Sequence, residues 1–264
     1  MKNEELEPEM DALIQRLEPD ITSEWRGATE DEIDQIEKIV KNISGKGLPK
    51  FYRWFLMRMG HSMGQLSIPD MDYSASTVIS YYKGGDEVED EDAKFLLIGH
   101  SSEGRLRLNM YYDLGHLARD DARVTKRAGD GGDDFKQFET FREMIAWRTM
   151  LFHCVEKFAK TCEGTLYDDS GENIFLKFGP LMTRLGFTKS PVPTGPFCGL
   201  YEGSEAAMVT LDLIDFDTDE SDGFAFTLGG MDANCLRRIL GEIATVEDFV
   251  LEVDDDPHRL GYGS

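Results

Sequence analysis

Short apolar segments alternate with short acidic or glycine-rich runs along the whole chain, and this pattern limits the fold to small packed elements of secondary structure. No apolar run approaches the roughly 20 residues that a membrane span needs. The first residues are acidic rather than a basic lead into an apolar stretch, so we expect no standard secretion signal. A length of 264 residues allows one large domain or two small ones.

Acidic side chains outnumber basic ones by 51 to 28, which gives a formal net charge of −23. Apolar residues still make up 41%, so we expect a packed core rather than disorder. A field of this sign repels the phosphates of nucleic acids and anionic lipid surfaces, and it attracts basic proteins. We therefore expect a protein partner, and we expect neither nucleic acid nor a membrane as a ligand. The sequence leaves the oligomeric state open.

The cysteines and histidines form no recognised metal-binding or catalytic pattern. The cysteines Cys154, Cys162, Cys198 and Cys235 have no C-x-x-C spacing, which is typical of reduced thiols in a cytoplasmic protein. No H-x-x-x-H pair and no phosphate-binding glycine loop with its lysine is present. Residues 60–64 (GHSMG) match the spacing G-x-S-x-G, but they follow a predicted helix, so we interpret them as a loop and not as the turn that carries a catalytic nucleophile. We expect no metal, no cofactor and no enzymatic activity. An enzyme that uses buried carboxylates in the C-terminal part is the catalytic alternative, and it predicts a strongly shifted carboxyl pKa in a cleft.

The first part of the chain carries clear helix signals. Thr29 and Glu32 have the spacing of a capping box and open a predicted helix that glycines 45 and 47 end. Pro49 opens a second predicted helix, and a long helix from about 135 to 160 closes the region. We expect Trp25 to pack onto the fold, with an exposed site as the alternative. Strands are predicted at 65–68, 77–82, 95–99 and 106–112.

A second unit is predicted beyond residue 164. Its expected elements are a helix at 172–185, a proline-rich connector at 191–196, strands at 207–214 and 223–228, a helix capped by Asp232, and a last strand at 249–253. The fold class is therefore α+β. We expect a helical extension at 1–28, a mixed domain at 29–160 and a smaller α+β unit at 164–264.

The stretch from 27 to about 150 resembles the SUKH superfamily, whose members include yeast Smi/Knr-type regulators and many bacterial immunity proteins. The resemblance rests on the order and spacing of four segments. They are 28–37 (ATEDEIDQIE), 48–56 (LPKFYRWFL), 95–99 (FLLIG) and 138–145 (FETFREMI). It covers a little under half of the chain and does not extend to 164–264.

This resemblance implies a domain with two N-terminal helices, a bent and mainly antiparallel sheet and a closing helix, without catalysis of its own. It also implies a protein partner, in bacteria typically a toxin domain delivered by a contact-dependent or type VI-like system. Nucleic-acid-directed toxins tend to have basic clefts, which an acidic surface can occlude. The leading hypothesis is thus an immunity protein, and the alternative is a regulatory interaction module without a toxin partner.

Two acidic runs are the candidate partner-binding sites. The first comprises Asp86, Glu87, Glu89, Asp90, Glu91 and Asp92, and the second comprises Asp215, Asp217, Asp219, Glu220 and Asp222. The second run is not an EF-hand loop, because its sixth position holds Glu220 instead of glycine and its twelfth holds Phe226 instead of glutamate. Solvated loops that only keep the protein soluble are the alternative interpretation of both runs.

Overall fold

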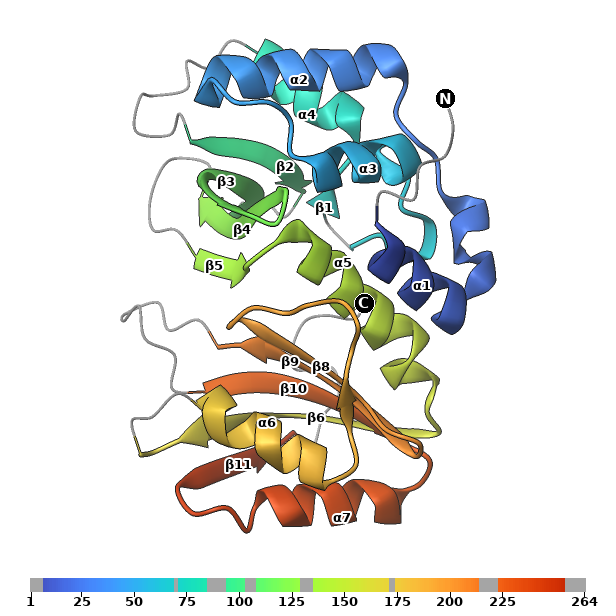
Figure 1. The fold of residues 1–264 in the computed structure, drawn as a ribbon, viewed down its shortest axis with the longest axis vertical. Helices are drawn as coiled ribbons and strands as arrows, with labels where there is room; N and C mark the ends of the chain where they lie inside the picture. The colour runs from blue at the N-terminus through green and yellow to red at the C-terminus, as the bar shows by residue number, and fades with distance from the viewer. Residues whose placement is uncertain are drawn as a thin grey trace. The chain divides into compact units, whose positions relative to one another are not determined.

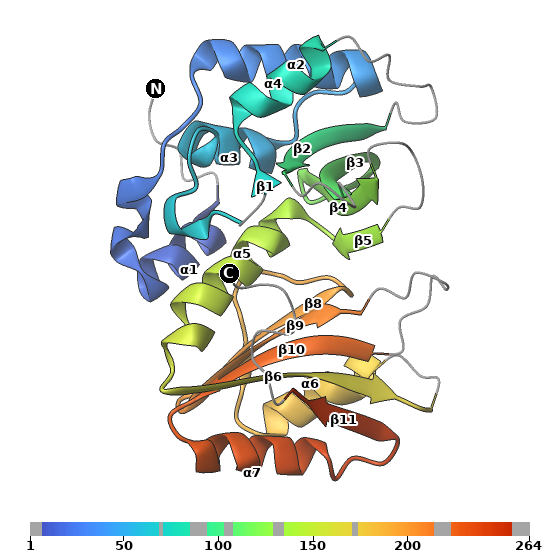
Figure 2. The same ribbon diagram turned by 180° about the vertical axis from the view of Figure 1, so that it is seen from behind.

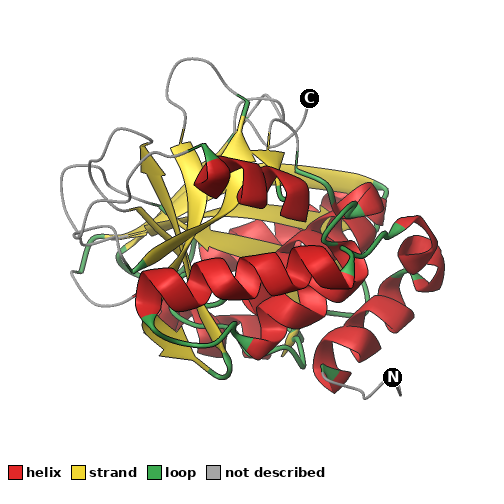
Figure 3. Ribbon diagram, turned by 90° about the horizontal axis from the view of Figure 1, so that it is seen from above, coloured by secondary structure: helices red, strands yellow, loops and turns green. Residues whose placement is uncertain are grey.

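The computed structural model describes residues 7–68, 71–84, 94–102, 108–128, 135–170, 174–213 and 223–254. The chain folds into two compact units, Met1–Met144 and Ile145–Ser264. Each unit combines an antiparallel sheet with helices (Figure 1, Figure 3), so the expected α+β class is confirmed. The division between the two units falls inside a helix, and it lies earlier in the chain than the boundary expected near 160–164.

The first unit begins with short helices that turn apolar side chains inward. Its helices before residue 95 are α1 (Pro8–Leu17), η1 (Pro19–Glu24), α2 (Glu30–Ser44), α3 (Lys50–Met59), η2 (Gly64–Leu66) and α4 (Ala75–Lys83). The first two lie in the expected N-terminal extension and bury Leu13 and Ile21. Trp25 follows them and is buried, edge-on to Trp54 with 6.4 Å between ring centroids. The expected packing of Trp25 is therefore confirmed.

The structure confirms the two helices that were predicted from capping signals. At the start of α2, the Glu32 backbone N–H donates to Thr29 Oγ1, and Glu32 Oε2 accepts from the Thr29 N–H at 2.8 Å. Gly45 ends α2 in the left-handed conformation with φ of 68°, which glycine adopts without a steric penalty. Helix α3 begins after Pro49. The aromatic residues that α3 buries are Phe51, Tyr52, Trp54 and Phe55.

Strands that follow one another in the chain lie side by side in the sheet of the first unit. They are β1 (Met71–Asp72), β2 (Phe95–Ser101), β3 (Leu108–Ala118), β4 (Asp121–Ala128) and β5 (Phe135–Phe138). A two-residue turn joins β3 to β4, and its residues Arg119 and Asp120 have positive φ values of 53° and 61°, which suits the right-handed twist of a hairpin. The helix α5 (Phe141–His153) follows, and the Phe141 ring packs against Tyr112 of β3.

Two of the strands predicted for this unit are wrong. Residues 65–68 lie in and just after η2, and residues 77–82 lie in α4. Ser74 caps α4 by accepting a hydrogen bond from the Thr77 N–H. The buried residues of α4 are Ala75, Val78 and Ile79. Their spacing of three and four residues favours a helix over the strand that the β-branched and tyrosine side chains suggested.

The helix expected at 135–160 is wrong at both ends. Residues 135–138 form β5, and the helix itself begins only at Phe141. Glu143 sets this start, because its Oε2 accepts the backbone N–H groups of Glu139 at 2.8 Å and Thr140 at 3.4 Å. The helix ends at His153, and a strand begins at Lys160.

The second unit is built on a six-stranded antiparallel sheet in the order β11-β6-β10-β9-β8-β7. Its elements after α5 are η4 (Val155–Lys157), β6 (Lys160–Asp168), α6 (Ile174–Arg184), β7 (Thr188–Lys189), β8 (Cys198–Glu202), β9 (Ala206–Asp212), β10 (Gly223–Gly230), α7 (Ala233–Ile243) and β11 (Phe249–Val253). Helices α6 and α7 lie on the same face of this sheet (Figure 1, Figure 2), where Phe178 and Ile239 pack with Met208 and Phe224 of the strands.

Most expected elements of the second unit are confirmed. Helices α6 and α7 and strands β9, β10 and β11 lie where they were predicted, within a few residues at their ends. Asp232 caps α7 as expected, since its Oδ1 accepts the Cys235 N–H at 2.8 Å. The proline-rich segment 191–196 contains neither helix nor strand. Strands β6, β7 and β8 were not predicted, because their sequences mix polar, glycine and cysteine residues without clear alternation.

Candidate functional site

Both predicted acidic runs lie outside the described residues, in the segments 85–93 and 214–222. The structure does place the elements that these segments join. The first segment follows α4 and precedes β2, while the second connects the adjacent antiparallel strands β9 and β10. The Leu213 N–H donates to the Gly223 carbonyl at 3.2 Å, so both ends of the second segment are held together at one end of the sheet.

That end of the six-stranded sheet carries further acidic side chains from three other chain positions. Strand register puts Asp168 of β6 opposite Phe249 of β11 and Asp212 of β9 opposite Phe224 of β10. We call this set the acidic sheet end, and it comprises Asp168, Asp169, Asp212, Glu247 and Asp248. The residues that flank the segment 214–222 lie at this end of the sheet, and the sequence of the segment contains five more acidic residues.

One member of the acidic sheet end is buried and serves the fold. The side chain of Asp168 is fully buried, and Lys177 Nζ lies 3.2 Å from its Oδ1 and 3.1 Å from its Oδ2. Burial by itself raises the pKa of Asp168, but hydrogen bonds from Ser170 and Lys177 outweigh it and lower the pKa below the ordinary value. Lys177 also lies 3.7 Å from Asp248 Oδ2. This lysine is therefore already occupied by two carboxylates.

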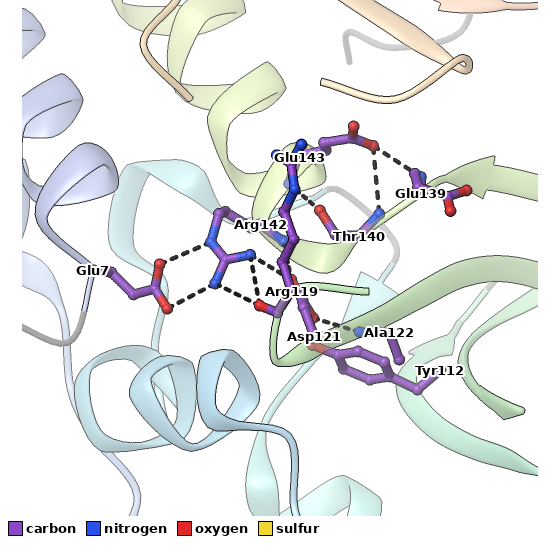
Figure 4. Close-up of polar contacts among 9 residues, drawn as sticks. All are labelled: Glu7, Tyr112, Arg119, Asp121, Ala122, Glu139, Thr140, Arg142 and Glu143. Carbon is purple, nitrogen blue, oxygen red and sulfur yellow. Dashed lines mark hydrogen bonds and ion pairs between the residues drawn. The ribbon is translucent and has the colours of Figure 1, made fainter. Parts of the chain in front are cut away.

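The first unit contains a buried polar network around Arg142 (Figure 4). Arg142 Nε and Nη2 donate to the two carboxylate oxygens of Glu7, both at 2.7 Å, and its guanidinium also contacts the Arg119 carbonyl at 3.4 Å. Burial lowers the pKa of Arg142, but its bonds to Glu7 and the nearby charge of Asp121 outweigh that effect and raise it. The guanidinium therefore stays charged inside the protein.

Asp121 is the second ionisable centre of this network and is completely buried. Its carboxylate accepts the Tyr112 hydroxyl at 2.6 Å, the Ala122 N–H at 2.8 Å and the Arg142 N–H at 2.8 Å. Desolvation raises the pKa of Asp121 to about 6, although these bonds and the Arg142 charge oppose the shift. A carboxyl with such a pKa suits acid–base chemistry, but every bond of Asp121 goes to the fold, so its role is structural.

A partly exposed ionic cluster lies on the five-stranded sheet of the first unit. His116 Nε2 is 2.7 Å from Glu139 Oε1 and 2.8 Å from Arg123 Nη2, and Arg123 pairs with Glu139 Oε2 at 3.0 Å. The Nε2 atom either donates to Glu139 or accepts from Arg123, so the tautomer of His116 decides which of the two it bonds. This triad joins β3, β4 and the residue after β5, and it stabilises that corner of the sheet.

The loop 60–64, the thiol of Cys162 and the carboxyl of Asp168 have structural surroundings. Arg26 and Ser62 form an isolated antiparallel bridge, and the Ser62 hydroxyl accepts the Gly64 N–H at 3.2 Å. Burial raises the pKa of Cys162 to about 11, so this thiol remains protonated and is a poor nucleophile. In the C-terminal unit, the buried carboxyl Asp168 has a lowered pKa rather than the raised pKa of a general acid.

Within the described part of the chain, no group of three or more histidine, cysteine, aspartate or glutamate side chains is placed to hold a metal ion. None of the described helices combines the length and apolar character needed to cross a membrane.

Comparisons with protein-family models, with curated proteins and with solved structures gave no match for this chain. The interpretation of the site therefore depends on its own geometry and charge.

Sequence reasoning missed most residues of the buried network and of the acidic sheet end. Glu7 and Arg142 are 135 positions apart, so no local pattern connects them. The acidic sheet end comes from the ends of β6 and β9 and the turn before β11, which only strand register brings together. The pair Asp168–Asp169 followed by Ser170 and Gly171 is a turn signal that marks the end of β6.

Proposed function

We propose that this protein is an immunity protein that binds a basic, nucleic-acid-directed bacterial toxin domain in the cytoplasm and occludes its active site. The observation that carries the proposal is the acidic sheet end, where acidic side chains from three chain positions lie at the same end of the sheet as Leu213 and Gly223, the residues that flank the acidic segment 214–222. The nearby Lys177 is already neutralised by Asp168 and Asp248, so the charge offered to a partner is negative. Such a surface complements a cleft built to hold phosphates.

We further propose that residues 27–150 form a SUKH-like domain. Its support is the order of elements in the first unit: the helices α2 and α3, an antiparallel sheet, and the helix α5 that follows it. The segments that carry the resemblance lie on these elements, since 28–37 opens α2, 48–56 opens α3 and 95–99 lies in β2.

Electrostatic steering supplies a measurable signature of this function. Oppositely charged partners associate faster than neutral ones, and salt reduces this gain because it screens exposed charges. If the acidic segments steer association, charge reversal there lowers the association rate at low salt. The off-rate should change less, because rim charges act mainly on encounter.

The test begins with purification of the protein from its native host at low salt, followed by native mass spectrometry. We expect a stoichiometric complex with one basic protein, whose toxic activity is lost in the complex. A bare protein, or a mixture of unrelated host proteins, would favour the regulatory interaction module instead.

Matched variants then locate the interface. Asp217→Lys/Asp219→Lys and Asp90→Lys/Asp92→Lys each change one acidic run, whereas Asp20→Lys/Asp34→Lys makes the same charge change at exposed positions of the first unit. At about 50 mM salt, we expect an interface variant to associate roughly tenfold more slowly and the control to change by less than about twofold. Equal rates for a run variant and the control would remove that run from the interface.

A further inference from the structure

Strand β11 forms one edge of the six-stranded sheet. It pairs with β6 on one side, and in the described part of the chain no strand lies on its other side. An edge strand presents unpaired backbone donors and acceptors, which are a template for pairing with another extended chain. The backbone groups and side chains of β11 determine which kind of chain could pair with it.

The ladder with β6 shows which backbone groups of β11 face outward. The Asp254 N–H donates to the Glu163 carbonyl at 2.9 Å, and the Asp169 N–H donates to the Asp248 carbonyl at 2.9 Å. Hydrogen-bonded pairs alternate along an antiparallel ladder, so Val250 and Glu252 also bond toward β6. The N–H and C=O groups of the alternate residues Leu251 and Val253 therefore point away from the sheet.

The side chains of β11 combine exposed apolar surface with acidic neighbours. Val250 and Val253 are 40% and 43% exposed. Residues 247–256 (EDFVLEVDDD) hold six acidic side chains and no basic one. Exposed valines suit a paired strand, while the acidic side chains select the charge of what pairs with it.

Gly164 holds β11 close against the sheet. A Cβ atom at this position would lie only 2.2 Å from the Glu252 carbonyl oxygen. Glycine at 164 thus lets β11 approach β6 closely at Val253, which is its partner in the strand register.

We propose that β11 is a docking strand that accepts an extended basic segment of a partner protein as an added strand of the sheet. The inference rests on the proposed function for the identity of that partner, and the edge itself gives the mode of binding. A second copy of this chain fits poorly, because pairing β11 with itself would set acidic residues against acidic residues.

Backbone amide hydrogen exchange, followed by NMR on the full chain, tests the proposal directly. In the free protein we expect Leu251 and Val253 amides to exchange fast, and Val250, Glu252 and Asp254 amides to exchange slowly. The probe is a short synthetic peptide of alternating lysine and valine. It should slow exchange at Leu251 and Val253 by at least about tenfold. The control is a peptide of the same length with glutamate in place of each lysine, and we expect it to have no effect.

A proline variant separates backbone pairing from general attraction. Val253→Pro removes one outward N–H and leaves the ladder with β6 intact, whereas the control Val253→Ala keeps that N–H. We expect the lysine–valine peptide to bind the proline variant about tenfold more weakly and the alanine variant within about threefold of the original. Glu252→Lys/Asp254→Lys keeps every backbone group and should also weaken this peptide by about tenfold.

Several results would overturn the proposal. Slow exchange at Leu251 and Val253 before any peptide is added would mean that another part of the chain, or a second copy, already covers the edge. Equal binding of both peptides, or peptide protection elsewhere in the sheet, would also refute it. If the native partner binds without protecting these two amides, the docking-strand inference fails while the proposed function stands. If the peptide pairs with β11 but no basic partner exists, the proposed function fails while the docking strand stands.

Discussion

Replacing Glu7 with alanine should destabilise the first unit, because it leaves the Arg142 guanidinium buried without its main partner. The two side chains are only 11% and 9% exposed, and two hydrogen bonds of 2.7 Å join them. The pair also connects the residue before α1 to the first turn of α5. Its loss should therefore affect the folding of the whole unit.

The expected cost follows from the burial of this pair. Removing one partner of a buried ion pair costs about 3–5 kcal/mol, because the other charge stays uncompensated. Arg142 keeps the Arg119 carbonyl at 3.4 Å and Asp121 Oδ2 at 3.8 Å. We therefore expect the lower end of the range, about 3 kcal/mol, which corresponds to roughly a hundredfold change in the unfolding equilibrium.

Urea denaturation followed by tryptophan fluorescence measures this change, since Trp25 and Trp54 are both buried in the first unit. The control is Lys50→Met, which breaks the 2.8 Å ion pair between Lys50 and Asp120. The side chain of Lys50 is 70% exposed and that of Asp120 is 61% exposed. We expect this exposed pair to contribute less than about 1 kcal/mol. Similar losses for the two variants, or a loss below about 1 kcal/mol for Glu7→Ala, would refute the argument from burial.

Three other predictions concern local features. Thr29→Ala removes the capping box of α2 and should cost about 1 kcal/mol of unfolding free energy in the same urea assay. Asp121 has a folded pKa of about 6, above its unfolded value of 3.8, so its contribution to stability falls as pH rises from about 4 to 6. Relative to Asp121→Asn, the original protein should lose of the order of 3 kcal/mol over that window, and parallel pH profiles would contradict the shift. Gly164→Ala should push β11 off β6 and speed amide exchange at Val250 by at least about tenfold; unchanged exchange would show that the strand adapts.

The elements predicted correctly are those whose sequence carries its own boundary signal. Thr29 with Glu32 marks the start of α2, and Asp232 marks the start of α7. In each case the capping side chain bonds to a backbone group three residues away, so a short window contains the whole interaction. The order of the predicted helices and strands then suffices to assign the α+β class.

Two elements were predicted poorly although their capping bonds are local, because the side-chain types or spacing of the same segment indicated a different structure. The segment 77–82 has side chains typical of a strand, yet it is helical because Ser74 caps it and its apolar face is buried. The start of α5 depends on Glu143 bonding back to Glu139 and Thr140, in a segment whose phenylalanine spacing alone suggested a longer helix. Local propensity is a weak prior where burial decides.

The candidate site shows the same division. The acidic runs within 86–92 and 215–222 stand out in the sequence because their residues are consecutive or nearly so, and they lie outside the described residues. Asp168 and Asp248 do not stand out, because antiparallel register alone brings the end of β6 to the start of β11. Which of 51 acidic side chains gather at one place is a property of topology rather than of composition.

The helix α5 makes the two units inseparable by a single cut. Its first turn, with the cap from Glu143, belongs to the first unit, while Ile145 and the rest belong to the second. A fragment starting at 145 would lack that cap and begin inside a helix, and a fragment ending at 144 would keep only one turn of it. An exchange of either unit for another would therefore need its junction outside Phe141–His153, so that the whole helix moves with one of the two units.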